Sequence, residues 1–228
     1  MRADARVPHE GSCEVAKRMQ IGCPMREAAG GGELGGIVLA AGAGRRFGQP
    51  KALVAFGGEL LVERAVRLLT EGGCRPVWAV LGAGADEVQQ LADFGAGRPV
   101  LAADWDEGMG ASLRAGLAAA VVSDAQAVIV VLADQPLVGV QSVHRLRAAW
   151  QGGAVAAVAG YDGRPRNPVL LSRAIWGDVA QSAVGDVGAR GWLRAHRELV
   201  TVVPCDDTGD PLDVDTPDDL AALVEETR

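Results

Sequence analysis

The chain has 228 residues, a length that favours one domain with a single core. Hydrophobic residues make up 49% of it and the mean hydropathy is +0.14, a composition that provides a buried core and excludes a disordered acidic protein. The net charge is −7 and no block of Lys or Arg is longer than a pair, which argues against a basic face for nucleic acid.

The sequence also predicts where the protein works. The most apolar run, from Ala125 to Ala133, is too short for a bilayer-spanning helix and ends at Asp134. The start of the chain, Met1 to Ala28, has no continuous apolar stretch typical of a secretory signal. The four cysteines form no CxxC pair and no zinc-ligand spacing. We therefore expect a soluble cytoplasmic protein with reduced thiols and neither nucleic acid nor membrane as partner.

Short apolar runs alternate with helix-like segments after a different N-terminal part. Residues 1–35 mix charges and end in the glycine-rich run Gly30 to Gly36, which predicts a flexible appendage before a domain over 36–228. The predicted strands are Ile37–Ala41, Val77–Leu81, Val100–Ala102, Val128–Leu132 and Ala154–Ala159, with a hairpin over Gly160–Leu171. The predicted helices are Leu60–Leu69, Ser112–Val122, Val140–Trp150 and Pro217–Glu226.

This alternation of strands and helices predicts an α/β fold with a mostly parallel or mixed sheet and helices on both faces. In such sheets ligands bind outside the carboxyl ends of the strands. The loops after Ala41, Leu81, Ala102 and Leu132 should therefore meet at one edge of the sheet.

The segment from Leu39 to Lys51 follows the first predicted strand and has the composition of an anion-binding loop. Glycines 42 and 44 allow backbone amides to approach a phosphate closely, and Arg45, Arg46 and Lys51 add positive charge. The segment matches neither the GxxxxGK[ST] loop nor the dinucleotide fingerprint, which wants a third glycine where Phe47 stands. An ordinary glycine-rich turn with incidental cations is the alternative.

Carboxylates after two other segments could hold a metal ion. Asp134 follows a β-branched strand, and one carboxylate opposite a phosphate loop suits Mg²⁺, which binds through one or two carboxylates and substrate phosphates. The alternative for Asp134 is a helix cap. Asp213 and Asp215 precede a predicted cap in which Thr216 and Asp219 begin a helix, and either could be a second metal ligand.

Three further segments carry groups for an anionic substrate. Ser112 and Arg114 lie at the start of a predicted helix after Gly108, where small residues alternatively serve helix packing. Arg166 lies in the predicted hairpin, and Arg190 follows Gly185-Asp186-Val187-Gly188. Ordinary turn chemistry explains the last two segments equally well.

Taken in order, these segments resemble the pattern of the MobA-like nucleotidyltransferases, and within them the molybdenum cofactor cytidylyltransferases. The resemblance covers about residues 36–226 and implies a Rossmann-like, three-layer α/β fold. It also implies Mg²⁺-dependent transfer of CMP from CTP, as co-substrate, to the terminal phosphate of a molybdopterin acceptor, with release of pyrophosphate. The form Leu39-Ala40-Ala41-Gly42 resembles the cytidine-using branch, since the guanine-using branch has two glycines there.

The resemblance also assigns roles to residues. Lys51, Arg46 and Asp134 are expected to be catalytic, Asp134, Asp213 and Asp215 to bind the metal, and Arg114, Arg166 and Arg190 to hold the acceptor. The nucleotide is expected to contact Leu39, Ala40, Ala41, Gly42, Gly44, Arg45, Lys51, Gly82, Ser112, Arg114 and Gln135. A molybdenum hydroxylase or its maturation factor is the expected recipient of the product.

Other activities on the same fold remain open. Nicotine blue oxidoreductase resembles the same family, and such a chain would bind NAD(P)H, with or without flavin, and reduce a quinone-like dye without a magnesium carboxylate. Nucleotidyl transfer to a sugar or polyol phosphate is another alternative, as is a non-catalytic carrier of the cofactor, although Lys51 and Asp134 are both present.

Overall fold

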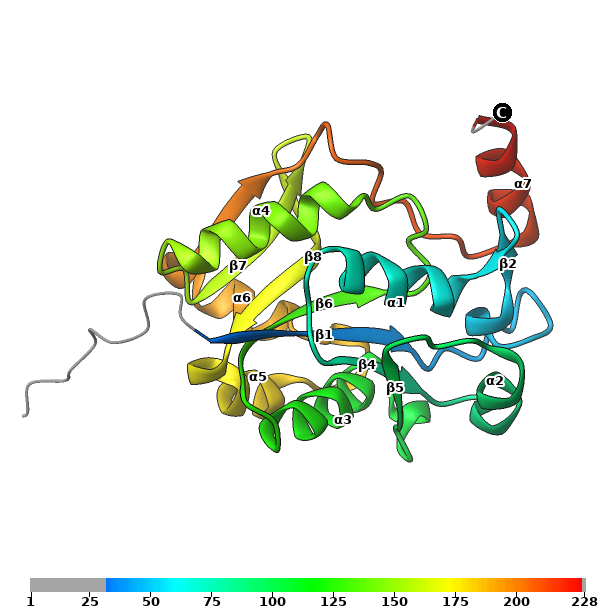
Figure 1. Ribbon diagram of the computed structural model, residues 1–228, viewed down its shortest axis with the longest axis horizontal. Helices are drawn as coiled ribbons and strands as arrows, with labels where there is room; N and C mark the ends of the chain where they lie inside the picture. Colours follow the sequence, from blue (N-terminus) through cyan, green and yellow to red (C-terminus); the bar gives the residue numbers. More distant parts are fainter. Residues whose placement is uncertain (1–31, 227–228) are drawn as a thin grey trace, which may run out of the picture.

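A seven-stranded sheet lies at the centre of the computed structural model, which describes residues 32–226 (Figure 1). Its order is β5-β4-β1-β6-β8-β7-β9, and β8 runs antiparallel to its two neighbours while the other pairs are parallel. The strands are β1 (Glu33–Ala40), β4 (Val77–Leu81), β5 (Gly97–Leu101), β6 (Ala125–Leu132), β7 (Ala156–Tyr161), β8 (Arg164–Ser172) and β9 (Val200–Pro204). The predicted α/β class with a mostly parallel mixed sheet is confirmed.

Helices cover both faces of the sheet. One face packs against α1 (Leu61–Glu71) and α4 (Val140–Gln151), and the other against α3 (Met109–Val121), α5 (Trp176–Ser182) and α6 (Arg190–Ala195). In Figure 1, α1 and α4 lie above the sheet and α3 and α5 below it. The helices α2 (Ala85–Leu91) and α7 (Pro217–Glu226) and the small hairpin of β2 (Ala55–Phe56) and β3 (Glu59–Leu60) lie toward the end of the sheet where β1 finishes.

The central strand β1 is buried on both faces because its residues alternate between two cores. Leu34 and Val38 belong to the core under α1 and α4, and Ile37 to the core under α3. A Cβ on Gly35 would lie 2.7 Å from the ring of Trp78, and one on Gly36 would lie 2.8 Å from the side chain of Leu69. The absence of a side chain at positions 35 and 36 therefore leaves room for Trp78 and Leu69 to pack against β1.

The predicted flexible joint is therefore wrong at its end, because β1 already begins at Glu33. The glycine count indicated a linker, whereas the packing of side chains from β4 and α1 requires these glycines in a strand. The appendage predicted for residues 1–35 otherwise lies outside the described residues, and the division at residue 36 stays a prediction.

Most predicted elements occur, with shifted ends. Val77–Leu81 and Pro217–Glu226 have the predicted bounds. Helix α3 begins at Met109 rather than Ser112 because Gly108, with φ +110°, turns the chain into it, and β6 begins at Ala125, where alanine side chains are buried. The predicted hairpin is formed by β7 and β8. The helices α2, α5 and α6 and the edge strand β9 were not predicted, because short segments carry little periodic signal.

Two further findings concern the described part of the chain. Within residues 32–226, no helix combines the length and apolar character that crossing a bilayer requires. The thiols of Cys74 and Cys205 are both buried and free of disulfides, and burial raises the pKa of Cys74 to about 12.

Candidate active site

The loop after β1 folds back so that Lys51 returns to the end of that strand. The Phe47 N–H donates to the Gly44 carbonyl at 2.8 Å, and the Lys51 N–H donates to the Gly42 carbonyl at 3.3 Å. Gly44 has φ +57°, and a Cβ there would lie 2.0 Å from the carbonyl oxygen of Gln49. Only glycine fits this position, so the turn that returns Lys51 depends on it.

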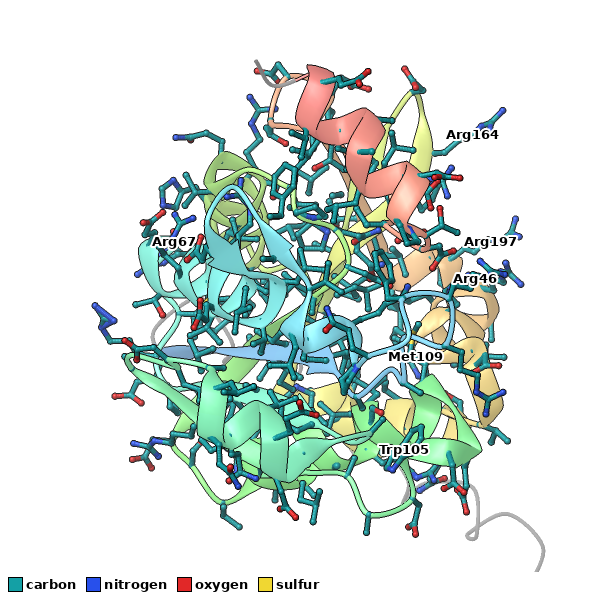
Figure 2. The ribbon with its side chains drawn as sticks, turned by 90° about the vertical axis from the view of Figure 1, so that its right-hand side faces the viewer. Arg46, Arg67, Trp105, Met109, Arg164 and Arg197 are labelled. Atoms are coloured by element: carbon teal, nitrogen blue, oxygen red, sulfur yellow. The ribbon has the colours of Figure 1, made fainter. Side chains whose placement is uncertain are left out.

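An open cleft of about 640 Å³ lies at this edge of the sheet, at the carboxyl ends of the parallel strands. Figure 2 faces this edge and labels Arg46, Met109 and Trp105 around it. The predicted residues that line the cleft are Leu39, Ala41, Gly42, Gly44, Arg45, Arg46, Lys51, Ser112, Asp134 and Asp215. The structure therefore brings together the glycine loop and two of the three predicted metal-binding carboxylates.

Lys51 lies between two of these carboxylates. Its Nζ donates to Asp134 Oδ2 at 2.7 Å and to Asp215 Oδ1 at 2.5 Å, and Arg46 Nη1 lies 3.6 Å from the second carboxylate oxygen of Asp215. Burial by itself lowers the pKa of Lys51, but the two carboxylates outweigh it and raise that pKa above its ordinary value. The site thus holds a protonated lysine next to a paired acidic group.

The backbone fixes the two carboxylates relative to each other. Asp134 follows β6 in the centre of the sheet, and its carbonyl accepts a hydrogen bond of 2.8 Å from the Val214 N–H. Asp215 comes next in the chain after Val214. Residues 80 positions apart in sequence therefore meet because the segment before α7 pairs with the loop after β6.

Asp213 is directed elsewhere. Its Oδ1 accepts a hydrogen bond of 2.9 Å from Gln135 Nε2, which also donates to the Pro211 carbonyl. Burial raises the pKa of Asp213, and the negative charge of Asp134 adds to the rise. Neither Gln135 nor Asp213 lines the cleft, so the pair connects the loop after β6 to the segment before α7 instead of facing a ligand.

Other predicted residues also lie outside the cleft lining. Ala40 is buried in the core, and a Cβ on Gly82 would lie 2.5 Å from Trp105, so this glycine lets the tryptophan pack against the end of β4. Arg114 donates to the Ala183 carbonyl at 2.6 Å and pairs with Glu107 at 2.9 Å.

The cations predicted to hold the acceptor do not converge. Arg166 lines a separate cavity of about 480 Å³ beside the turn between β7 and β8, together with Arg164. Arg190 is the first residue of α6 and does not line the cleft. The structure therefore does not bring Arg114, Arg166 and Arg190 to one place.

The cleft also contains residues to which the sequence assigned no site role. Trp105, Asp106 and Met109 come from the segment between β5 and α3, and Asp186 approaches from far along the chain. Asp186 Oδ1 accepts a hydrogen bond of 3.4 Å from the Met109 N–H. The placement of Trp105 and Asp106 just after a strand is the signal that could have found them, because loops after parallel strands share this edge.

No group of three or more His, Cys, Asp or Glu side chains within residues 32–226 has the arrangement of a protein-only metal cage. The pair Asp134 and Asp215 supplies hard carboxylate oxygens at the cleft. Mg²⁺ is bound by one or two carboxylates when phosphates and waters complete its octahedron, so this donor set fits magnesium held jointly with a nucleotide.

The chain is similar in sequence to two characterised classes of protein and in structure to a solved mycobacterial protein. A molybdenum cofactor guanylyltransferase from Rhodobacter capsulatus is 33% identical over 202 residues, which cover 86% of this chain and 97% of that protein. Nicotine blue oxidoreductase from Paenarthrobacter nicotinovorans is 38% identical over 196 residues, covering 83% and 95%. The crystal structure of Rv0371c from Mycobacterium tuberculosis H37Rv with manganese matches with a TM-score of 0.70 and 27% identity, covering 85% and 98%.

A family model agrees with these relatives and with the geometry. The model described as the MobA-like NTP transferase domain matches residues 36–202, which include the glycine loop, Lys51 and Asp134. The seven-stranded mixed sheet agrees with the structural match. The chain belongs to the MobA-like NTP transferase family of nucleotidyltransferases.

Proposed function

We propose that the protein transfers CMP from CTP to the terminal phosphate of a molybdopterin-type acceptor, with Mg²⁺ and release of pyrophosphate. The observation that carries the proposal is the cluster of Lys51, Asp134 and Asp215 beside the Gly42–Gly44 loop. A dinucleotide reductase has no need for paired carboxylates around a lysine, whereas a triphosphate with its metal ion needs both charges.

Asp134 and Asp215 would hold the magnesium ion, and Lys51 would then turn from them to the triphosphate. The bound ion would neutralise phosphate charge as pyrophosphate leaves. Asp213 would support this pair through Gln135 rather than bind the metal, because its Oδ1 already accepts a hydrogen bond away from the cleft.

The reaction requires the protein mainly to position the two substrates and to neutralise their negative charge. An oxygen of the acceptor phosphate forms a bond to the α-phosphorus while the bond from that phosphorus to the bridging oxygen of the leaving pyrophosphate breaks. The attacking oxygen is already anionic, so no general base is required. Amides of Gly42 to Gly44 with Arg46 and Lys51 would bind the phosphates, and in-line orientation supplies much of the rate.

Support for CTP comes from the wall of the cleft. Ala41 lines it, and a Cβ built on Gly82 would lie 2.8 Å from the Ala41 Cβ and 2.5 Å from the Trp105 side chain, so both side chains lie close to Gly82. The methyl group of Ala41 leaves less room beside the loop than a second glycine would, which favours a pyrimidine over a purine. The guanylyltransferase among the relatives makes GTP the donor to test against it.

The acceptor's binding residues follow less directly from the geometry. Arg114 is engaged with Glu107, whereas Arg166 has no ion-pair partner within the described residues and lies open to the second cavity. We propose Arg166 as the cation for a distal anionic group of the acceptor. The protein would act in the cytoplasm and deliver its product to a molybdenum hydroxylase or its maturation factor.

Reduction of an aromatic dye with NAD(P)H is the second candidate. The 38% identity to nicotine blue oxidoreductase favours it, and Trp105 and Met109 give the cleft an aromatic and apolar wall against which a flat ring could stack. This reaction would not require Asp134 or a divalent ion.

Thermal denaturation with CTP, GTP and NADH, each with and without Mg²⁺, separates these functions because a ligand that binds the native state raises Tm. We expect stabilisation by CTP that requires Mg²⁺ and is lost in Asp134→Asn and Asp215→Asn. The matched control Asp213→Asn should keep it, since residue 213 does not line the cleft and an amide oxygen can still accept the hydrogen bond from Gln135. Stabilisation by NADH alone, equal in all variants, would refute the transferase proposal.

A further inference from the structure

The carboxylate of Asp219 binds the backbone of the residue that faces Lys51. Its Oδ2 accepts hydrogen bonds from the Asp215 N–H at 3.0 Å and from the Thr216 N–H at 2.8 Å. In return, Thr216 Oγ1 accepts a hydrogen bond of 3.2 Å from the Asp219 N–H. The start of α7 is therefore a reciprocal cap that reaches one residue further back than a cap requires.

That extra hydrogen bond lies next to the cluster of Lys51, Asp134 and Asp215. The Asp215 side chain contacts Lys51 Nζ at 2.5 Å, while its own N–H is held by Asp219. The preceding residue, Val214, is held by the carbonyl of Asp134 at 2.8 Å. The backbone at Asp215 and at the residue before it is thus anchored, once to the loop after β6 and once to α7.

Helix α7 is itself attached to the segment that carries Lys51. Leu223 of α7 and Val214 form a small apolar cluster with Val54, Phe56 and Leu61. Figure 1 shows α7 next to β2, the strand that follows Lys51 by a few residues. One element therefore contacts the chain near both partners of the Lys51–Asp215 pair.

We propose that Asp219 is a positioning residue that, through the cap of α7, fixes the Asp215 carboxylate against Lys51 and in the geometry that a divalent ion with nucleotide requires. Asp219 does not line the cleft and touches no reacting group. The kinetic consequence rests on the proposed function, whereas the geometric consequence for Lys51 does not.

Asp218 provides a matched control. It lies in the same first turn of α7, so its charge interacts with the helix dipole as that of Asp219 does. Within the described residues it makes no hydrogen bond or ion pair to Asp215 or Thr216. A role limited to stabilising the helix predicts similar effects for the two residues, whereas positioning predicts an effect for Asp219 alone.

The test measures Mn²⁺ binding by electron paramagnetic resonance with CTP present, together with kcat and KM for pyrophosphate release. We expect Asp219→Ala to weaken Mn²⁺ binding and lower kcat by about 10- to 100-fold, the range for groups that orient metal ligands. The KM for CTP should change little. Asp219→Asn should recover most of the loss, since an amide oxygen can accept the same two hydrogen bonds, and Asp218→Ala should behave as the unchanged protein.

One further variant and one further readout keep the test decisive if Asp219→Ala is unstable or if no enzyme activity is found. Thr216→Val removes the hydroxyl that caps α7 but leaves the bond from Asp215 to Asp219, so it should lower Tm with little change in Mn²⁺ binding. Lys51 and Lys17 are the chain's only lysines, so acetylation of Lys51 by acetic anhydride can be followed by mass spectrometry against Lys17.

Acetylation of Lys51 should be several-fold faster in Asp219→Ala than in Asp218→Ala, because a loosened contact between Asp215 and Lys51 Nζ leaves the amine more accessible to the reagent. Equal acetylation rates in the two variants would overturn the positioning role even if the transferase activity is present. Absence of pyrophosphate release from the unchanged protein would instead refute the proposed function and leave the acetylation test standing.

Discussion

Replacing Lys51 by Met should leave two carboxylates facing each other without the cation between them. The contacts of 2.7 Å and 2.5 Å to Lys51 Nζ put Asp134 Oδ2 and Asp215 Oδ1 no more than about 5.2 Å apart. Two unit charges at that separation repel by about 3 kcal/mol at an effective dielectric constant of about 20 and by about 1 kcal/mol in bulk water. Asp215 is half exposed, so we expect Lys51→Met to lose about 1–3 kcal/mol of unfolding free energy at pH 8.

The sign of the metal dependence follows from the same charges. Mg²⁺ should reduce the stability deficit of Lys51→Met even without nucleotide, because it can take the place of the ammonium group between the two carboxylates.

Urea denaturation of the unchanged protein and of Lys51→Met at pH 8, with and without added Mg²⁺, measures these effects. The matched control is Lys51→Arg, which keeps a cation near the pair. A Lys51→Met protein as stable as the unchanged one at pH 8, or one whose stability is indifferent to Mg²⁺, would refute the reasoning about the paired carboxylates.

Three other predictions test the packing around the site. Gly44→Ala should destabilise the protein by about 2–4 kcal/mol in urea denaturation and abolish nucleotide binding, whereas Gly48→Ala, also at positive φ but with open space around it, should cost only about 1–2 kcal/mol; equal costs would contradict the close approach at Gly44. Hydrogen bonds from Arg67 lower the pKa of Glu59 in the folded protein, so the stabilisation they give is present above the unfolded-state pKa of Glu59 and is lost as pH falls through its folded-state pKa. Glu59→Gln should therefore make the unfolding free energy less dependent on pH in the acid range. An unchanged pH dependence would count against this ion pair. Cys74 should resist thiol reagents at pH 8 until the protein unfolds, as mass spectrometry of the labelled chain can show, and rapid labelling of the native protein would contradict its burial.

The sequence predicted the central features of the fold because they depend on local patterns. Buried strands at Val77–Leu81 and a helix capped by Thr216 and Asp219 are encoded in continuous segments, and both occur with the predicted bounds. The glycine pair at the end of the N-terminal run was misjudged, because composition cannot show that Trp78 and Leu69 approach these glycines from other elements.

The candidate site divides in the same way. The loop from Gly42 to Lys51 and the strand-end Asp134 were found because both follow predicted strands. Asp213 and Asp215 could not be distinguished by spacing, since the difference arises from the hydrogen bond that Gln135 donates to Asp213 and the contact that Lys51 makes with Asp215. Such contacts span about 80 residues or more of sequence and follow only from the folded chain.

The most direct test of the proposed function measures pyrophosphate release by the purified full-length chain with molybdopterin and either CTP or GTP. Each reaction is run with Mg²⁺ and with excess chelator. Oxidation of NADH with a quinone-like dye is measured under the same two conditions. We expect Mg²⁺-dependent pyrophosphate release that is faster with CTP and depends on the acceptor. NADH oxidation that continues in the chelator, without pyrophosphate release from either nucleotide, would contradict it.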